Sequence, residues 1–240
     1  MRTVEPKGGT GLPGAASAGR PRAAGAPGGR AVAVAGATGL VGREILRGLL
    51  GDETVTAVHA LGRRSLALQH PRLTSHVVDF SALPPLPALD EVYLALGTTI
   101  RVAGSQAAFR AIDFDANLAV ARAAKAAGAR RVGLVSAMGA DARSRIFYSR
   151  VKGEIEEALS ALGFEALVIA RPSFLAGDRE ALGQPARTGE KVGLYVSALL
   201  RPLIPSNYRA VAAIDVAGAL LARVPAARGR ELLLSGAMQG

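Results

Sequence analysis

The sequence AVAVAGATGLVG, residues 31 to 42, passes from an apolar run directly into a glycine-rich turn. Ala31 to Ala35 alternates small residues with valine, which is typical of a short strand buried on both faces of a parallel sheet. Gly36, Gly39 and Gly42 follow at intervals of three, and the apolar residues after them recur at helical spacing. The stretch therefore predicts a strand, a tight turn and a helix.

A helix that starts in such a turn predicts a phosphate site. The first turn of a helix has unpaired backbone N–H groups and a partial positive charge, and both attract a pyrophosphate. We expect Gly36 to allow the turn, Gly39 to let the backbone approach the phosphates and Gly42 to let the helix lie close to the strand. The strand before and the helix after the glycines favour a dinucleotide-binding unit over a simple packing turn.

Composition excludes several function classes. The chain of 240 residues is half hydrophobic and has no cysteine, so thiol chemistry and thiolate metal sites are excluded. His59, His70 and His76 are its three imidazoles, and we predict no metal site. No long uncharged apolar run is present, so we expect no membrane span and a cytoplasmic protein.

The net charge of +10 comes almost entirely from scattered arginines, and aromatic residues are few. A basic domain can bind phosphate backbones nonspecifically, but stacking platforms for single strands are scarce here. We expect no specific nucleic-acid partner, and a homo-oligomer is left open.

Residues 1–29 are rich in Gly, Pro and Ala and show no hydrophobic periodicity. We expect this extension to be disordered and without function. Its arginines leave a transit peptide open, although Gly and Pro oppose the amphipathic helix that such a signal needs. Residues 30–240 are expected to form one domain.

Strand-like and helix-like segments alternate along this domain, a pattern that predicts an α/β fold. We expect a single Rossmann-type, doubly wound parallel sheet with helices on both faces. The expected strands are 31–35, 54–61, 76–80, 91–96, 131–136, 166–170 and 232–234, and the expected helices include 105–127, a lid helix at 192–200 and 215–224.

The end of the second expected strand predicts the cofactor. In such folds the residues just past this strand meet the adenosine ribose, where an acid suits NAD and arginine suits the 2′-phosphate of NADP. Arg63 and Arg64 follow the strand directly and favour NADP(H) over NAD(H). Asp79 is expected at the carboxyl end of the third strand, beside the adenine, and Gly97 in another turn near the cofactor.

Tyr148 and Lys152 lie four residues apart in a helical segment, so their side chains leave the same helix face. A free tyrosine has a pKa near 10, and a nearby ammonium lowers it toward the range useful for acid and base catalysis. Ser136 ends the preceding strand, and its hydroxyl could hold a substrate carbonyl. These three residues predict a catalytic group.

The sequence resembles the atypical branch of the short-chain dehydrogenase/reductase superfamily. The motif GATGLVG, the serine at a strand end and YSRVK carry this resemblance over about residues 30–235. The stretches LGTTIRVAGSQAAFRAIDFD, VSAMGAD, FYSRVKGEIE and RPSFLAGDRE are similar to the Tat-interacting-protein-like oxidoreductases, whose bacterial members are often labelled nucleoside-diphosphate-sugar epimerases.

The resemblance implies roles for individual residues. Ser136 polarises the carbonyl, Tyr148 transfers a proton, and Lys152 lowers the pKa of Tyr148 and holds the ribose. The remaining cofactor contacts that it implies are Gly36, Thr38, Gly39, Leu40, Val41 and Gly42 on the pyrophosphate, Arg63 and Arg64 on the 2′-phosphate, Asp79, Leu96 and Gly97 near the adenosine, and Arg171, Pro172 and Ser173 beside the nicotinamide.

Two positions depart from the family pattern. Asp113 stands where many members have an asparagine that orders a proton-relay water, and Ala137 replaces the second serine of a frequent pair.

Three functions stay open from the sequence. The first is an NADP(H)-dependent oxidoreductase that acts on a small carbonyl or alcohol. The second is a nucleotide-sugar epimerase or dehydratase, which Arg63, Arg64 and the short C-terminal portion disfavour. The third is a noncatalytic NADPH-binding sensor or adaptor.

Overall fold

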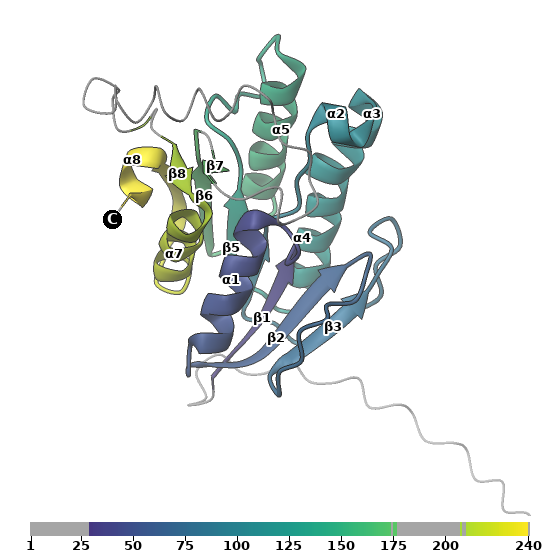
Figure 1. The fold of residues 1–240 in the computed structure, drawn as a ribbon, viewed down its shortest axis with the longest axis vertical. Helices are drawn as coiled ribbons and strands as arrows, with labels where there is room; N and C mark the ends of the chain where they lie inside the picture. The colour runs from purple at the N-terminus through teal and green to yellow at the C-terminus, as the bar shows by residue number, and fades with distance from the viewer. Residues whose placement is uncertain (1–28, 174, 177–206, 208–209, 240) are drawn as a thin grey trace, which may run out of the picture.

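The structure, a computed structural model, describes residues 29–173, 175–176, 207 and 210–239. Seven parallel strands form one sheet in the order β3-β2-β1-β4-β5-β6-β9, and helices cover both of its faces (Figure 1). This arrangement confirms the predicted α/β class and the doubly wound parallel sheet. Residues 1–28 of the expected extension and the expected lid helix at 192–200 lie outside the described residues.

The described elements follow the predicted alternation. The strands of the sheet are β1 (Arg30–Ala35), β2 (Val55–Gly62), β3 (Leu73–Val77), β4 (Glu91–Leu94), β5 (Arg131–Val135), β6 (Ala166–Arg171) and β9 (Gly229–Leu234), and β7 (Leu175–Ala176) pairs separately with β8 (Val211–Ala212). The helices are α1 (Leu40–Gly51), α2 (Ile100–Ala103), α3 (Gln106–Arg110), the π helix η1 (Ala111–Ala116), α4 (Asn117–Ala126), α5 (Phe147–Ala161), α7 (Ala213–Arg223) and α8 (Ser235–Met238).

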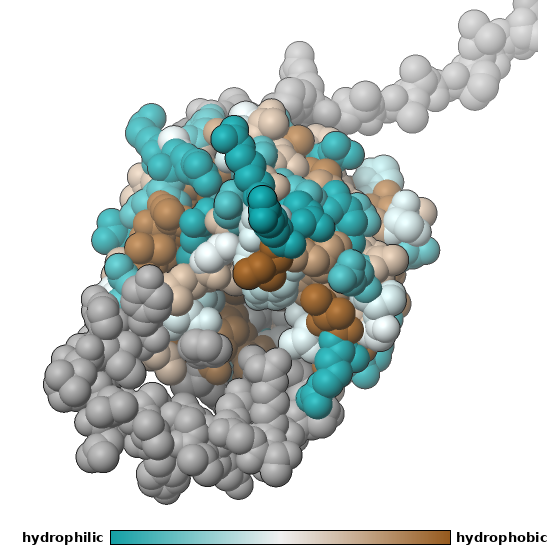
Figure 2. Space-filling model, turned by 90° about the horizontal axis from the view of Figure 1, so that it is seen from above, coloured by the Kyte–Doolittle hydropathy of each residue, from teal (hydrophilic) through white to brown (hydrophobic). Residues whose placement is uncertain are grey.

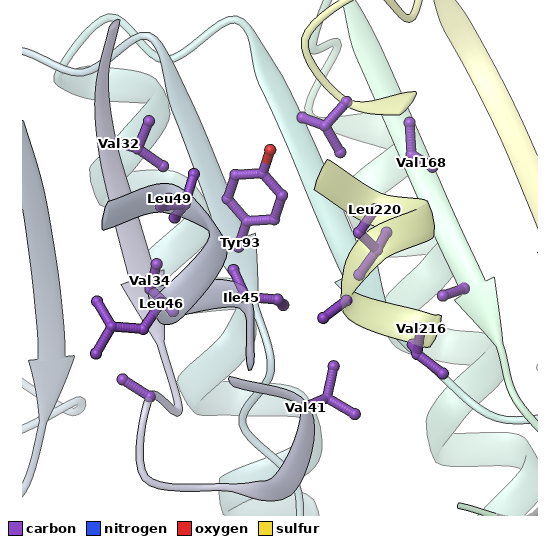
Figure 3. Close-up of a cluster of buried hydrophobic side chains, with 14 of the residues drawn as sticks. Val32, Val34, Val41, Ile45, Leu46, Leu49, Tyr93, Val168, Val216 and Leu220 are labelled. Carbon is purple, nitrogen blue, oxygen red and sulfur yellow. The ribbon is translucent and has the colours of Figure 1, made fainter. Parts of the chain in front are cut away.

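Strand β1 is buried on both faces, as its composition predicts. Val32 and Val34 point into one hydrophobic cluster, while Ala33 and Ala35 belong to a second cluster across the sheet. The valine side fills the space under α1 and α7, where Ile45, Leu46 and Leu49 meet Tyr93, Val216 and Leu220 (Figure 3). The alanine side packs against α4 and α5.

The strand order reverses between β1 and β4. β1 pairs with β2 on one side and with β4 on the other. The connection after β1 therefore runs toward one edge of the sheet, and the connection after β4 runs toward the opposite edge. In open parallel sheets, ligands bind in the crevice outside the carboxyl ends of the strands at such a switch point. The glycine turn after β1 and Gly97 after β4 both follow these strand ends.

Three strand boundaries predicted from the sequence were wrong, and the first is that of the last strand, which was expected at 232–234 but begins at Gly229. The third strand lies at 73–77 rather than 76–80, because β3 is an edge strand with little buried surface, and Val77 is 62% exposed. Its apolar residues therefore do not mark its position. The expected strand 91–96 also ends early, at Leu94.

The expected helix 105–127 is not one α-helix. The π helix η1 separates α3 from α4, and its buried residues are Asp113 and Ala116. Short π-helical segments are rare and occur frequently at functional sites. The alanine-rich composition favours a regular helix and gives no sign of this interruption.

Candidate functional site

The turn after β1 needs glycine at two of its three predicted positions for steric reasons. Gly36 has φ +89°, and a Cβ atom there would lie 2.4 Å from the carbonyl oxygen of Ala95. A Cβ atom on Gly42 would lie 2.0 Å from the carbonyl oxygen of Gly36. Gly36 therefore lets the turn pass the end of β4, and Gly42 lets α1 lie directly on the turn, as the sequence predicts.

The start of α1 fits a phosphate group. Gly39 is the N-cap residue, no side chain caps the helix, and a Cβ atom on Gly39 would lie 3.3 Å from the carbonyl oxygen of Gly36. The first N–H groups of a helix have no partner within it, so an anion can accept from them. Thr38 is exposed beside this turn, whereas the side chains of Leu40 and Val41 are buried in the core. Leu40 and Val41 can therefore meet a phosphate only through their backbone.

Arg63 and Arg64 lie where the sequence places them, directly after β2. Both side chains are exposed, and neither has an ion pair with another of the described residues. Asp79 is also exposed, two residues beyond the end of β3, and its Oδ1 accepts hydrogen bonds from the backbone N–H and the hydroxyl of Ser81. These hydrogen bonds lower the pKa of Asp79. The two arginines remain available to a phosphate.

Tyr148 and Lys152 lie on α5, one helical turn apart, as predicted. The side chain of Lys152 is only 7% exposed, and its Nζ lies 2.7 Å from Oδ1 of Asp113. Tyr148 is partly buried, and its ring packs on Phe109 of α3 with 5.5 Å between centroids. A Cβ atom on Gly97 would lie 3.5 Å from Asp113 Oδ1 and 3.9 Å from Lys152 Nζ, so the buried ion pair adjoins the turn after β4.

Lys152 keeps its charge in this buried place. Burial lowers the pKa of its ammonium, but the negative charge of Asp113 raises it, together with Tyr148 and Glu156, and the net shift of the pKa is upward. An ammonium held in this way can act on Tyr148 and on a ribose hydroxyl. The charged lysine therefore fits the chemistry that the YSRVK motif predicts.

Ser136 is buried at the end of β5, where its hydroxyl donates a hydrogen bond to Oε1 of Glu156 over 2.5 Å. Arg171 donates to both oxygens of the same carboxylate, at 2.9 Å and 2.6 Å, and Arg230 of β9 donates to Oε2 at 3.3 Å. The bonds to Glu156 raise the pKa of Arg171. In this structure Arg171 is therefore bound to Glu156, whereas the sequence resemblance places it beside the nicotinamide.

The other expected contacts surround this cluster. The carbonyl oxygen of Pro172 accepts from the backbone N–H of Met138, and the N–H of Ser173 donates to the hydroxyl of Ser235. The carbonyl oxygen of Leu96 accepts from Nδ2 of Asn117. These bonds join the segment after β5 to the segment after β6, the segment after β6 to α8, and the segment after β4 to α4.

His59 Nδ1 and His76 Nε2 lie 3.0 Å apart on neighbouring strands, and both burial and His76 lower the pKa of His59. Within the described ranges, no three His, Asp or Glu side chains are grouped so that they could hold a metal ion. The same ranges contain no helix long and apolar enough to cross a membrane.

A family model described as NAD(P)H-binding matches residues 36–195, which include the glycine turn and the Ser136, Tyr148 and Lys152 positions. The chain belongs to this NAD(P)H-binding family. The family confirms the predicted nicotinamide dinucleotide, and the choice between NADP and NAD stays a prediction.

Curated relatives of this NAD(P)H-binding protein come from fungi. Protein fmp52, mitochondrial, of Emericella nidulans is 38% identical over 181 residues, which cover 70% of this chain and 75% of the relative. Protein FMP52, mitochondrial, of Eremothecium gossypii is 41% identical over 150 residues, which cover 61% and 67%. The relatives are named as mitochondrial proteins, which contradicts the cytoplasmic location expected from the sequence. Composition cannot reveal a location that a receptor reads from a short segment.

Solved structures share the fold. MoeE5 in complex with UDP-glucuronic acid and NAD has a TM-score of 0.64 at 20% identity, covering 85% of this chain and 75% of that one. A short-chain dehydrogenase family protein of Francisella tularensis has a TM-score of 0.63 at 12% identity, covering 87% and 98%. These likenesses confirm the predicted Rossmann-type fold, and the resemblance of the sequence to the atypical short-chain dehydrogenases/reductases is consistent with it.

The sequence did not reveal the role of Glu156. Glu156 follows Lys152 by four residues, so helical spacing places both on one face of α5. This spacing is visible in the sequence, but one partner of Glu156, Arg230, lies on a strand 74 residues further along the chain. Gly153 was missed as well: a Cβ atom there would lie 2.0 Å from the backbone nitrogen of Ala142, so this glycine lets the loop after β5 lie against α5.

Proposed function

We propose that this protein is an NADP(H)-dependent oxidoreductase that transfers hydride to or from a small carbonyl or alcohol. Tyr148 acts as the acid and base, Lys152 holds the ribose and supports Tyr148, and Ser136 contacts the substrate oxygen. The observation that carries the proposal is the buried, charged Lys152, one helical turn from Tyr148 and adjacent to Gly97 at the strand switch point.

Residues at the strand ends would hold the dinucleotide. The uncapped start of α1 receives the pyrophosphate, and Arg63 or Arg64 receives the 2′-phosphate, because both guanidinium groups are exposed next to the end of β2. When bound, NADPH supplies the hydride for the carbonyl carbon.

Tyr148 supplies the proton in the reductive direction. Its hydroxyl donates to the carbonyl oxygen, the product alcohol leaves, and solvent returns a proton to the tyrosinate. The hydroxyl of Ser136 donates its proton to Glu156. Its Oγ can therefore only accept a hydrogen bond from a substrate, and a substrate hydroxyl can donate one. Tyr148 is then the proton donor for a carbonyl.

A noncatalytic NADPH sensor is the second candidate function. Two observations favour it: the Ser136 proton is donated to Glu156, and the Lys152 ammonium is paired with Asp113. Both groups are thereby held by acidic side chains of the protein itself. A sensor needs the dinucleotide site but needs no proton donor.

Substitutions of Tyr148, Lys152 and Ser136 separate these candidates. Tyr148→Phe removes the transferable proton and keeps the ring, so cofactor binding should persist while carbonyl turnover falls by about 10²- to 10⁴-fold. Lys152→Ala should weaken both turnover and NADPH binding, and Ser136→Ala should spare NADPH binding. NADPH affinity is measured by fluorescence titration and turnover by NADPH absorbance.

Ser149→Ala is the matched control, because Ser149 is the neighbour of Tyr148 on the same helix. This control should keep both turnover and affinity. Wild-type-like turnover in Tyr148→Phe would refute Tyr148 as the proton donor.

A further inference from the structure

Asp113 is a buried carboxylate for which the proposed chemistry has no use. Its side chain has no exposed surface, and Oδ1 lies 2.7 Å from the Nζ atom of Lys152. The other oxygen, Oδ2, accepts a hydrogen bond from the backbone N–H of Thr98 over 2.9 Å. Both oxygens therefore have a fixed neighbour, and the carboxylate cannot turn away from the lysine.

The local backbone keeps Asp113 in this position. The residue lies within the π helix η1, which is anchored by Asn117 at the start of α4. The Nδ2 of Asn117 donates to the carbonyl oxygens of Leu96, Ile112 and Asp113, at 3.1 Å, 3.3 Å and 3.1 Å. The wide turn is thereby tied to the end of β4, directly beside the lysine.

The charge balance near Tyr148 follows from this pairing. The charges that act on Lys152 are Asp113 from η1, and Tyr148 and Glu156 from its own helix, and Glu156 is already paired with two arginines. The ring of Phe109 covers Tyr148 from α3 and adds no charge. An ammonium alone would favour a tyrosinate, whereas an ammonium beside a carboxylate presents almost no net charge.

We propose that Asp113 is a positioning residue that holds the Lys152 ammonium and cancels most of its charge at Tyr148. The pair keeps the lysine in place for a ribose hydroxyl without converting the tyrosine into a base. Tyr148 then keeps the proton that it donates to the carbonyl oxygen in the reductive direction. This role of Tyr148 rests on the proposed oxidoreductase function.

The test follows the ionisation of Tyr148 directly, without a substrate. The chain has no tryptophan, so the near-ultraviolet absorbance of tyrosinate is free of overlap from indole. Titrating the full-length protein with alkali, and subtracting the curve of the same protein with Tyr148→Phe, isolates Tyr148 from Tyr93, Tyr195 and Tyr208. Burial raises the pKa of Tyr93, which keeps it out of the titrated range.

Asp113→Asn should move the Tyr148 titration to lower pH by about one unit or more, because it leaves the ammonium uncompensated. Asp115→Asn is the matched control: Asp115 lies in the same π helix but is exposed, and its substitution should leave the titration in place. Asp113→Glu keeps the negative charge and should also leave the Tyr148 titration at its wild-type position. Asp113→Asn is also combined with Lys152→Arg, because a guanidinium keeps its charge in alkali. A Tyr148 titration that stays at the wild-type position or moves to higher pH in this double variant would overturn the proposal.

A double substitution covers the case in which Asp113→Asn does not fold. Removing one partner of a buried ion pair strands the other charge, whereas Asp113→Asn with Lys152→Met removes both charges. If the pair presents almost no net charge, the double variant should titrate Tyr148 close to the wild-type position. An upward move of about one unit would show that Lys152 acts uncompensated and would contradict the proposal. Neither result depends on turnover, so failure of the proposed oxidoreductase function is seen separately, in the NADPH assay.

Discussion

At the scale of single residues, Arg63 and Arg64 carry the predicted preference for NADPH. Arg63 and Arg64 are exposed after β2, and neither forms an ion pair within the described part of the chain. A 2′-phosphate would gain charge-assisted hydrogen bonds from them, each worth about 1.5 to 3 kcal/mol, or roughly tenfold to a hundredfold in affinity. We expect NADPH to bind more tightly than NADH by a factor in this range.

Arg63→Ala with Arg64→Ala should abolish this preference by weakening NADPH binding and sparing NADH binding. Two other exposed arginines provide the control, Arg122 on α4 and Arg228 before β9, because their removal changes the net charge equally. Fluorescence titration with both dinucleotides measures the effect. Equal affinities in the wild type, or a preference that survives the Arg63 and Arg64 substitutions, would refute the assignment.

The residues that the sequence predicted well are those whose roles depend on near neighbours. Gly36 and Gly42 meet each other within one turn, and Tyr148 and Lys152 share one helix face, so spacing alone placed them. The partners of Lys152 and Ser136 depend on distant segments. Asp113 reaches the lysine from a π helix, and Glu156 is joined by arginines of β6 and β9.

At the scale of elements, the turn and helix α1 form one rigid unit. Gly42→Ala would place a methyl group 2.0 Å from the carbonyl oxygen of Gly36, so the helix must shift away from the turn. We expect this overpacking to cost about 1 to 3 kcal/mol of stability and to weaken NADPH binding, because the phosphate site moves with the helix.

Gly51→Ala is the control on the same helix. Its Cβ atom would meet nothing within 4 Å, so the substitution should leave NADPH affinity unchanged and should not lower the melting temperature. Thermal melting and NADPH titration of both variants make the comparison. If Gly42→Ala bound NADPH as well as Gly51→Ala does, α1 would not form the phosphate site.

The elements also show why strand and helix boundaries were predicted unevenly. Buried strands such as β1, β5 and β6 are continuous apolar runs, and their positions agree with the sequence prediction within one residue. The edge strand β3 buries little, so its apolar residues were misleading. The π helix was missed because composition gives no sign of the bonds of Asn117, which donates to Ile112 and Asp113 one turn earlier and to Leu96 after β4.

At the scale of the whole molecule, the sheet order builds the site. β1 and β4 are neighbours, which brings the glycine turn next to Gly97, and β5, β6 and β9 follow in order, which brings Ser136, Arg171 and Arg230 onto Glu156. The surface seen from above carries mainly hydrophilic side chains, with separate hydrophobic residues among them (Figure 2). Family membership and fold agree on a nicotinamide dinucleotide.

The reaction is the central claim, and NADPH consumption by the wild-type protein tests it most directly. A broad panel of aldehydes, ketones and quinones is screened after tight NADPH binding has been established, with Tyr148→Phe beside each positive. We predict that at least one carbonyl is reduced, and that its turnover falls by about 10²- to 10⁴-fold in Tyr148→Phe. NADPH consumption that stays at background across the panel, despite tight NADPH binding, would contradict the oxidoreductase and favour the sensor.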